Sequence, residues 1–456
     1  QCDATCQYGF VNAQRGLEHG FTVVKRPGGD GEKEGTSERE TGRHVQKPSV
    51  SPPLPLSFTL STRGTLNPMV SADSQGVLFQ DAAGATVLNY TGLKVWDADG
   101  KVLPSRFEAA GERAVRLLVD ESAARYPITI DPIAQQAYLK AHNTGVDDRF
   151  GYSVAVSGDT VVVGAYREDS SSTGVNSTPD DNATDAGAAY VFVRNGGVWS
   201  QQAYLKAHQV NAGDWFGFSV AAGGDTVVVG ASSEDSSSTG VNSIANESAS
   251  SAGAAYVFVR TGGVWTQQAY LKAHQVNASD FFGRTLDLSG DTVVVGAPGE
   301  DSSSTGVNSM PNESASAAGA AYVFVRNGST WSQQAYLKPD QVGSGDWFGE
   351  SAAVDGDTVV IGAYLEDSNS TGVNSTPNEN AVDSGAAYVF VRNGAVWSQQ
   401  AYLKAHQVNA DDRFGRAVGM DGDMVVVGAD WEDSSTTGVN NFPNESASNA
   451  GAAYVY

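Results

Sequence analysis

The sequence predicts an all-β protein, namely a β-propeller of five four-stranded blades of 66 residues, preceded by a small β-sandwich-like domain and a disordered linker. Each period holds four strand-like runs and two tight turns. The composition, with 40% hydrophobic residues and 52 glycines, suits a β-rich chain with many turns. The block Gln-Gln-Ala-Tyr-Leu-Lys recurs every 66 residues, beginning at Gln135, Gln201, Gln267, Gln333 and Gln399.

The composition of the chain before the repeats changes from segment to segment, and these changes predict the domain boundaries. The stretch 27–54 is rich in Gly, Glu, Lys, Ser and Pro and holds almost no large apolar residue, so it cannot bury enough surface to order itself. The predicted domains are therefore an N-terminal segment of a preceding β region (1–26), a flexible linker (27–54), a small β domain (55–133) and the propeller (134–456). In the small domain, Asp97, Asp99 and Gly100 favour a hairpin turn over a calcium loop, because no later Glu completes the pattern.

The first repeat shows how a blade is built. Alternating or β-branched runs predict strands at 150–156, 160–165, 187–193 and 198–206. Two-residue turns, Gly-Asp and Asn-Gly, join the first strand to the second and the third to the fourth. Such turns demand antiparallel neighbours, which favours propeller blades over a parallel β-solenoid.

A 21-residue polar loop, 166–186, joins the second strand to the third. In an up-and-down blade the connections alternate between two ends, so both tight turns fall at one end. The long loop and the ten-residue connection to the next blade fall at the other. Long loops on a rigid scaffold are where binding is usually found, so the loop-rich end is the candidate binding face.

The net charge of the chain excludes some classes of binding partner. The chain has 28 Lys and Arg against 52 Asp and Glu, a net charge of −24, and residues 135–456 carry −22 of it. A nucleic acid is therefore an unsuitable partner, since phosphate binding needs a basic face. No run of 18 apolar residues predicts a membrane span. The two cysteines, Cys2 and Cys6, form a local disulfide or are incidental thiols.

The first residue is Gln1, and the sequence stops within a strand-like run. We interpret the chain as a fragment or processed form, so the missing signal peptide carries no information.

Phe150-Gly151 followed by Val163-Gly164-Ala165, a pairing kept in each later copy, resembles the FG-GAP repeat, and the third copy keeps Gly-Ala-Pro at 296–298. This family includes the integrin α-chain propeller and many bacterial secreted and surface proteins. The motif sequences in this chain look most like those of the bacterial branch. The resemblance implies a blade fold and says little about the ligand. Integrin-type repeats often carry a calcium loop between these two strands. A two-residue turn occupies that place here, and it cannot supply six to eight oxygens.

The first candidate site is a Glu-Asp pair at the start of each long loop. Carboxylates followed by Ser, Thr and Asn supply the oxygen ligands that calcium prefers, so Ca²⁺ in these loops is one reading. The favoured reading is that these side chains bond their own backbone and shape the loop. The pairs are Glu168 and Asp169, Glu234 and Asp235, Glu300 and Asp301, Glu366 and Asp367, and Glu432 and Asp433.

The second candidate is an aspartate two positions before each Phe-Gly pair. It forms either an inner ring of carboxylates at the loop-rich end or, as favoured, a cap on the loop entering the first strand. If both acidic sets face one way, that end has a strong negative field. Beside this ring, Trp215 and Trp347 either stack on sugar rings or, as favoured, pack at the blade edge. The aspartates are Asp148, Asp214, Asp280, Asp346 and Asp412.

The histidines after Leu-Lys-Ala are expected to pack, since the fourth copy has Pro-Asp instead. The sequence holds no nucleophile elbow, zinc-protease motif or phosphate loop, and near-identical blades argue against one asymmetric active site.

The sequence therefore predicts a non-catalytic, secreted or cell-surface recognition or adhesion protein. The partner is a cell-surface protein or glycan, with no nucleic acid and no transmembrane span. A propeller enzyme acting on polysaccharide, as lyase or hydrolase, and a spacer without ligand are the alternatives. We also expect the segment 135–140 to close the ring as the fourth strand of the last blade.

Overall fold

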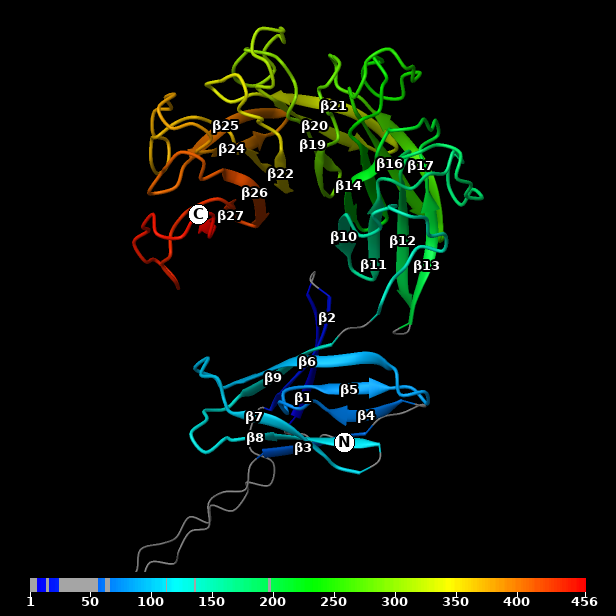
Figure 1. Cartoon of the computed structure of the whole chain (residues 1–456), viewed down its shortest axis with the longest axis vertical. Coiled ribbons are helices and arrows are strands. Elements are labelled where there is room, and N and C mark those ends of the chain that lie inside the picture. Colours follow the sequence, from blue (N-terminus) through cyan, green and yellow to red (C-terminus); the bar gives the residue numbers. More distant parts are fainter. Residues whose placement is uncertain are drawn as a thin grey trace, which may run out of the picture. The chain divides into compact units, whose positions relative to one another are not determined.

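The computed structural model describes residues 6–13, 16–23, 56–61, 66–111, 113–134, 137–195 and 198–456. They form two compact units, Gln1–Leu139 and Lys140–Tyr456. The regular elements of the described ranges are all strands (Figure 1), so none of these ranges holds a helix that could cross a membrane. The predicted linker at 27–54 and Cys2 lie outside these ranges.

The first unit is a two-sheet sandwich, as predicted. Its core lies between the sheets and includes Val95, Phe107, Leu117 and Ile130, all buried. The larger sheet has the order β1 (Cys6–Ala13), β2 (Gly16–Val23), β9 (Ile128–Ala134), β6 (Thr86–Trp96), β5 (Val77–Gln80) and β4 (Asn67–Val70). The smaller sheet has the order β3 (Leu56–Ser61), β8 (Ala114–Val119) and β7 (Ser105–Ala109).

Two details of this unit concern predictions made from the sequence, namely the domain boundary and the turn at Asp97. The hairpin of β1 and β2 pairs with β9, so the N-terminal segment shares a sheet with the predicted small domain. After β6, Asp97 Oδ1 accepts hydrogen bonds from the backbone N–H groups of Asp99 and Lys101, each at 3.0 Å. The Asp97 carboxylate therefore shapes a turn, as the sequence favours.

The second unit consists of five consecutive antiparallel sheets. The first is β10 (Ser153–Ser157), β11 (Thr160–Ala165), β12 (Ala188–Asn195) and β13 (Val198–Leu205). The second is β14 (Phe216–Gly223), β15 (Thr226–Ala231), β16 (Ala254–Thr261) and β17 (Val264–Leu271). The third is β18 (Thr285–Ser289), β19 (Thr292–Ala297), β20 (Ala320–Asn327) and β21 (Thr330–Leu337). The fourth is β22 (Ser351–Asp355), β23 (Thr358–Ala363), β24 (Ala386–Asn393) and β25 (Val396–Leu403). The fifth is β26 (Phe414–Asp421), β27 (Met424–Ala429) and β28 (Ala452–Val455).

These sheets follow one another as propeller blades around an open arc, with the sheets of β10 and β26 at its two ends (Figure 1). The first strand of each sheet contacts the first strand of the next, so β10, β14, β18, β22 and β26 form the inner wall. The second strands of the first four sheets are buried on both faces, which explains their continuous β-branched runs, whereas β27 of the fifth sheet alternates between exposed and buried residues.

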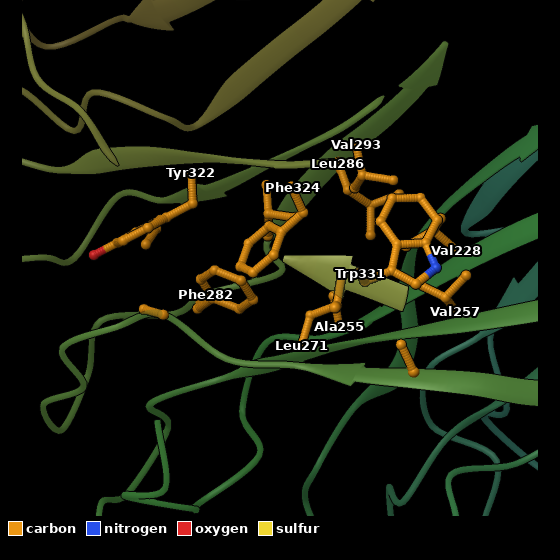
Figure 2. Close-up of a cluster of buried hydrophobic side chains, with 14 of the residues drawn as sticks. Val228, Ala255, Val257, Leu271, Phe282, Leu286, Val293, Tyr322, Phe324 and Trp331 are labelled. Carbon is orange, nitrogen blue, oxygen red and sulfur yellow. The ribbon is translucent and has the colours of Figure 1, made fainter. Parts of the chain in front are cut away.

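Neighbouring sheets share apolar cores. Figure 2 shows one of them, in which Val228 and Val257 of the second sheet meet Leu286, Phe324 and Trp331 of the third. Every one of these side chains is less than 9% exposed. The period-2 alternation of each strand supplies one such face to each neighbour.

Two glycines account for the pairing of Phe-Gly with Gly-Ala. A Cβ atom on Gly230 would lie 2.1 Å from the carbonyl oxygen of Gly283 in the next sheet. Gly283 has a φ of +87°, and its own Cβ would lie 2.3 Å from the Ala254 carbonyl oxygen. The Gly-Ala segment of one repeat and the Phe-Gly segment of the next therefore approach too closely for any side chain.

The opposite end, with the tight turns, is joined by polar contacts. Arg260 pairs with Asp225 at 2.7 Å and donates to Thr160 Oγ1 of the preceding sheet at 3.2 Å. Trp265 Nε1 donates to Gln202 Oε1, also of the preceding sheet, at 2.7 Å. These bonds link consecutive sheets at the end that lacks long loops.

The first four sheets confirm the prediction of four-stranded blades, and the fifth reaches β28, which ends one residue before the last residue of the sequence, Tyr456. The fifth sheet has three strands, and β28 pairs with β27 alone among the described residues. Ala137–Lys140 form no strand, and Gln135 and Gln136 lie outside the described residues. The predicted closure by 135–140 is therefore not formed by residues 137–140.

Candidate functional site

A buried glutamate fixes the start of each long loop. In the first sheet, Glu168 is 1% exposed and accepts hydrogen bonds from the Tyr204 hydroxyl at 2.8 Å and from Lys206 Nζ at 2.9 Å. Lys206 Nζ also donates to the carbonyl oxygen of Gly187 at 2.6 Å. Glu168 begins the loop and Gly187 ends it, so one ammonium joins both ends of the loop to β13.

The same contacts recur in the next three sheets, at 2.7–2.8 Å for the tyrosine and 2.9–3.0 Å for the lysine. All four lysines are fully buried. A buried charge is tolerated only when paired, so each glutamate and lysine depend on one another. The further sets are Glu234 with Tyr270 and Lys272, Glu300 with Tyr336 and Lys338, and Glu366 with Tyr402 and Lys404.

The aspartate of each Glu-Asp pair folds the loop back on itself. Asp169 Oδ1 accepts the backbone N–H of Asp185 at 2.9 Å, and the Asp169 carbonyl accepts that of Ala183 at 2.7 Å. The equivalent carboxylates accept the N–H of Ser251, Ala317, Asp383 and Asn449 at 2.6–2.8 Å. These bonds give the loop-shaping role that the sequence favours.

Calcium binding at the Glu-Asp pairs stays a prediction, and the contacts of the glutamates affect whether an ion can bind there. In four copies an ammonium already occupies the place where a cation would meet the glutamate. Across the described ranges, no three side chains of His, Cys, Asp or Glu form a group that could hold a metal ion. A calcium ion bound to the glutamate in any of these four copies would therefore have to displace the lysine.

The five aspartates before the Phe-Gly pairs are buried caps. Asp214 is 3% exposed, and its Oδ2 accepts the backbone N–H of Asn211 at 2.9 Å. Asp148, Asp280, Asp346 and Asp412 make the same bond to the residue three positions earlier. This is the capping role that the sequence favours.

Burial raises the pKa of these carboxyls. The pKa of Asp214 rises to about 8, those of Asp280 and Asp346 to about 7, and that of Asp412 to about 6. Nearby glutamates add to each rise. Since the Glu set is mostly neutralised by lysine and several of these aspartates keep their proton near neutrality, the negative field at this end is weaker than the formal charge suggests.

The residues that flank the Phe-Gly pairs differ between otherwise similar repeats. Those before the pair are Arg149, Trp215, Phe281, Trp347 and Arg413, and those after it are Tyr152, Phe218, Arg284, Glu350 and Arg416. We call these ten residues the variable row. Tyr166, at the start of a long loop, packs edge-on against Trp215 with ring centroids 5.5 Å apart, which places the row at the loop-rich end.

Contacts run along the variable row from one repeat to the next. The rings of Tyr152 and Phe218 lie 4.9 Å apart, and Arg284 lies over Phe218 at 5.2 Å. Glu350 accepts Arg284 Nε at 2.7 Å and Arg416 Nη1 at 2.8 Å. One side chain from each repeat therefore forms a continuous line of aromatic, cationic and anionic groups.

The backbone of the row is left-handed at five positions. The φ angles are +59°, +59°, +55°, +54° and +59° at Arg149, Trp215, Phe281, Trp347 and Arg413. Bulky residues rarely adopt this conformation, and such strain clusters at functional sites. Here it recurs in every repeat at the residue immediately before the Phe-Gly pair.

The long loops hold a second position that differs. Ile244, Met310 and Phe442 stand at one register of three loops and are 87–90% exposed. Exposed threonines, Thr178 and Thr376, occupy it in the other two. Large apolar side chains are therefore presented to solvent at this register, and buried lysines hold the ends of the loops that carry Ile244 and Met310.

A model of the FG-GAP repeat matches residues 133–192, 199–258, 265–324, 331–390 and 397–456. The chain belongs to the FG-GAP repeat family. Each matched FG-GAP segment after the first begins in the fourth strand of one sheet and ends in the third strand of the next. The family unit therefore spans the sheet-to-sheet contact at which Phe-Gly meets Gly-Ala. No curated protein matches the chain.

Other predicted residues fall within the packing of the FG-GAP blades. Trp215 and Trp347 are half-buried, and Trp215 stacks on Phe218 with centroids 5.8 Å apart. The His208 ring packs edge-on against Tyr270 at 5.4 Å and bonds Gln267 at 3.0 Å. Both results agree with the packing roles that the sequence favours.

Sequence reasoning missed the lysine of the Tyr-Leu-Lys block. The signal was present, because a lysine that recurs at the end of each apolar fourth strand matches the recurring Glu of the loop. It also missed the second half of the variable row, which is Tyr152, Phe218, Arg284, Glu350 and Arg416. Comparing the repeats position by position, for differences rather than identities, would have found them.

Proposed function

We propose that this FG-GAP protein is a non-catalytic recognition or adhesion protein, secreted or at the cell surface, and that its loop-rich end binds a cell-surface protein or glycan. The observation that carries the proposal is the variable row. Near-identical blades differ at this row, and the row combines arginines with aromatic rings.

The chemistry of the row suits recognition. Arginine and aromatic side chains are enriched at protein interfaces and dominate their binding energy, and aromatic faces also stack on sugar rings. The Arg284–Glu350–Arg416 contacts hold these groups in place before a partner arrives. Preorganised groups lose less conformational entropy on binding.

Glycan and protein arrays, probed with and without calcium, test this function. Matched variants then locate the surface. Arg284→Gln changes the row, whereas Arg326→Gln changes an arginine of the same repeat that pairs with Asp291 at the tight-turn end. We expect Arg284→Gln and Trp347→Ala to weaken binding about tenfold or more. Arg326→Gln should leave binding unchanged, and equal effects of the two arginine variants would contradict the assignment.

An enzyme acting on polysaccharide, as lyase or hydrolase, is the alternative. A carboxyl with a pKa of about 8, as at Asp214, has the protonation state of a general acid near neutrality. Asp214 is however 3% exposed and capped by its own loop, so a substrate has no access to it. Turnover of any polysaccharide would favour the enzyme, and no binding on any array would favour a spacer.

Calcium in the Glu-Asp loops is a separate proposal. It rests on the oxygen-rich composition of the loops, and the buried lysines predict that any binding is weak. Isothermal calorimetry and thermal unfolding at millimolar calcium measure it. No heat and no change in Tm would refute it.

A further inference from the structure

All but one of the Lys and Arg residues of the repeats lie in three places. Residues 140–456 hold 14 of them. Four lysines are buried with the glutamates of the long loops, namely Lys206, Lys272, Lys338 and Lys404. Four arginines pair with aspartates of the tight turns, namely Arg194, Arg260, Arg326 and Arg392. Apart from Lys140, the others are all arginines in the variable row or beside it, namely Arg149, Arg167, Arg284, Arg413 and Arg416. The variable row is therefore a concentration of cations on a unit that is acidic as a whole.

The variable row contains one carboxylate to balance these arginines. Glu350 accepts hydrogen bonds from Arg284 Nε at 2.7 Å and from Arg416 Nη1 at 2.8 Å. A single glutamate thus serves two guanidinium groups. The cations of the variable row outnumber its anions.

The other three arginines are still less compensated. Arg149 lies 3.6 Å from Asp147, and both side chains are more than half exposed, so this ion pair is weak. Arg167 adjoins Tyr166, whose ring packs against the variable row. Among the described residues, Arg167 and Arg413 form no ion pair, and the Nε atom of each is buried without a hydrogen-bond partner. These guanidinium groups therefore have donors that the described part of the chain does not use.

Aromatic rings hold the guanidinium groups in place. Arg284 lies over Phe218 at 5.2 Å and over Trp347 at 5.7 Å from the ring centroids. Arg416 lies over the ring of Tyr364 at 4.9 Å. Such stacking uses the face of a guanidinium group and leaves the N–H groups at its edge, which match the oxygens of a carboxylate or a similar anion. The variable row therefore combines aromatic faces with fixed anion-binding groups.

The variable row has the periodicity of the repeats. Its members stand at one register of successive repeats, and the rings of Tyr152 and Phe218 lie 4.9 Å apart. A ligand that follows the row therefore meets aromatic rings and cations at short, regular intervals. A polymer of similar ring-shaped units, some of them anionic, has the matching pattern.

We propose that the variable row binds an anionic polysaccharide, a chain of sugars that carry carboxylate or sulfate groups. The arginines pair with these anions, and the aromatic side chains lie against the sugar rings. The assignment rests on the proposed recognition function, whose ligand it specifies.

Two other anionic polymers fit the variable row less well. An acidic peptide supplies carboxylates but no sugar rings to lie on the aromatic side chains. A single-stranded nucleic acid supplies rings and phosphates, but it binds grooves that are basic along the backbone, and Glu350 lies within this row. A polysaccharide tolerates that carboxylate, because sugar hydroxyls can donate hydrogen bonds to it.

Two matched pairs of polymers test the proposal by biolayer interferometry on the full chain. Polygalacturonate and its fully methyl-esterified form share one sugar chain and differ in charge, and dextran sulfate and dextran test sulfate in the same way. EDTA is present throughout, so that calcium does not bridge the protein and the polymer. We expect at least one charged polymer to bind about tenfold or more tightly than its neutral counterpart. Its affinity should fall between about 50 and about 300 mM NaCl, since salt screens exposed ion pairs.

Three variants locate the binding surface. Arg284→Gln should weaken binding of the charged polymer about tenfold or more. Arg149→Gln removes an exposed side chain, leaves no buried carboxylate unpaired and should weaken binding about threefold. Arg326→Gln, at the tight-turn end, is the matched control and should leave binding unchanged. Thermal unfolding of the three variants confirms that they fold, and Arg149→Gln decides the matter if Arg284→Gln does not.

The outcomes separate this assignment from the proposed function. Equal affinity for the charged and the neutral member of both pairs, or equal effects of Arg149→Gln and Arg326→Gln, would overturn the assignment. Polyglutamate or single-stranded poly(dT) bound more tightly than either charged polysaccharide would overturn it in favour of an acidic peptide or a nucleic acid. If none of these polymers binds but a partner on the arrays binds and loses affinity with Arg284→Gln, the anionic polysaccharide is refuted and the recognition function stands. No binding on the arrays either would contradict both.

Discussion

Replacement of Lys272 by Met tests whether the buried ion pair holds the long loop. Lys272 Nζ donates to Glu234 Oε2 at 2.9 Å and to the Gly253 carbonyl at 2.6 Å, and the side chain is fully buried. The change leaves a buried carboxylate uncompensated, which costs about 3–5 kcal/mol. Since 1.4 kcal/mol is a factor of ten, local opening should become roughly two to four orders of magnitude more frequent.

Hydrogen exchange measures this opening at the loop itself. The Gly253 amide donates to the Glu234 carbonyl at 2.8 Å, so its exchange reports whether the loop ends are held together. Adding Glu234→Gln to Lys272→Met removes the unpaired charge and should recover part of the loss.

Lys140→Met is the matched control, because Lys140 belongs to the same sequence block and is exposed. It should change stability by less than about 0.5 kcal/mol. A decrease in stability below about 1 kcal/mol for Lys272→Met, or equal effects of the two variants, would refute the role of Lys272 in holding the loop ends together.

Two further predictions concern the pKa of Asp214 and the close approach at Gly230. Because burial raises the pKa of Asp214 to about 8, the folded chain keeps a proton that the unfolded chain releases near 3.8. This contribution to stability is complete below the unfolded pKa and is lost as pH rises through about 8, so Asp214→Asn should flatten the fall in urea-measured stability between about pH 5 and pH 8. A slope like that of the unaltered chain would contradict the shift. Gly230→Ala places a Cβ 2.1 Å from the Gly283 carbonyl oxygen and should cost several kcal/mol, on the order of 3 or more. Gly428→Ala, at the same register of the fifth sheet, meets nothing closer than 3.6 Å and should be tolerated in thermal unfolding. Similar melting temperatures for the two would show that the close approach is not limiting.

Much of the propeller was predictable because its signals are local. The Thr-Val-Val-Val-Gly-Ala run and the Gly-Asp turn fix β11 and its hairpin without reference to distant residues, and the predicted 160–165 coincides with Thr160–Ala165. The long loop was placed by the same turns. Repetition then carried each assignment to the later sheets.

The site was less predictable because its contacts join distant residues. Glu168 and Lys206 are 38 positions apart and meet only when β13 pairs with β12. The pKa of Asp214 depends on burial by its own loop and on Glu234, which no local pattern shows.

The Glu–Tyr–Lys contacts recur in the first four sheets, whereas the variable row differs from repeat to repeat. One repeat can therefore take the place of another without loss of these contacts. A repeat moved to another place in the arc keeps its Glu–Tyr–Lys contacts, because these lie within its own sheet. The order of groups along the row changes with it. Duplication or shuffling of whole repeats can therefore produce new binding surfaces without a new fold, and selection can act on the surface while the scaffold stays fixed.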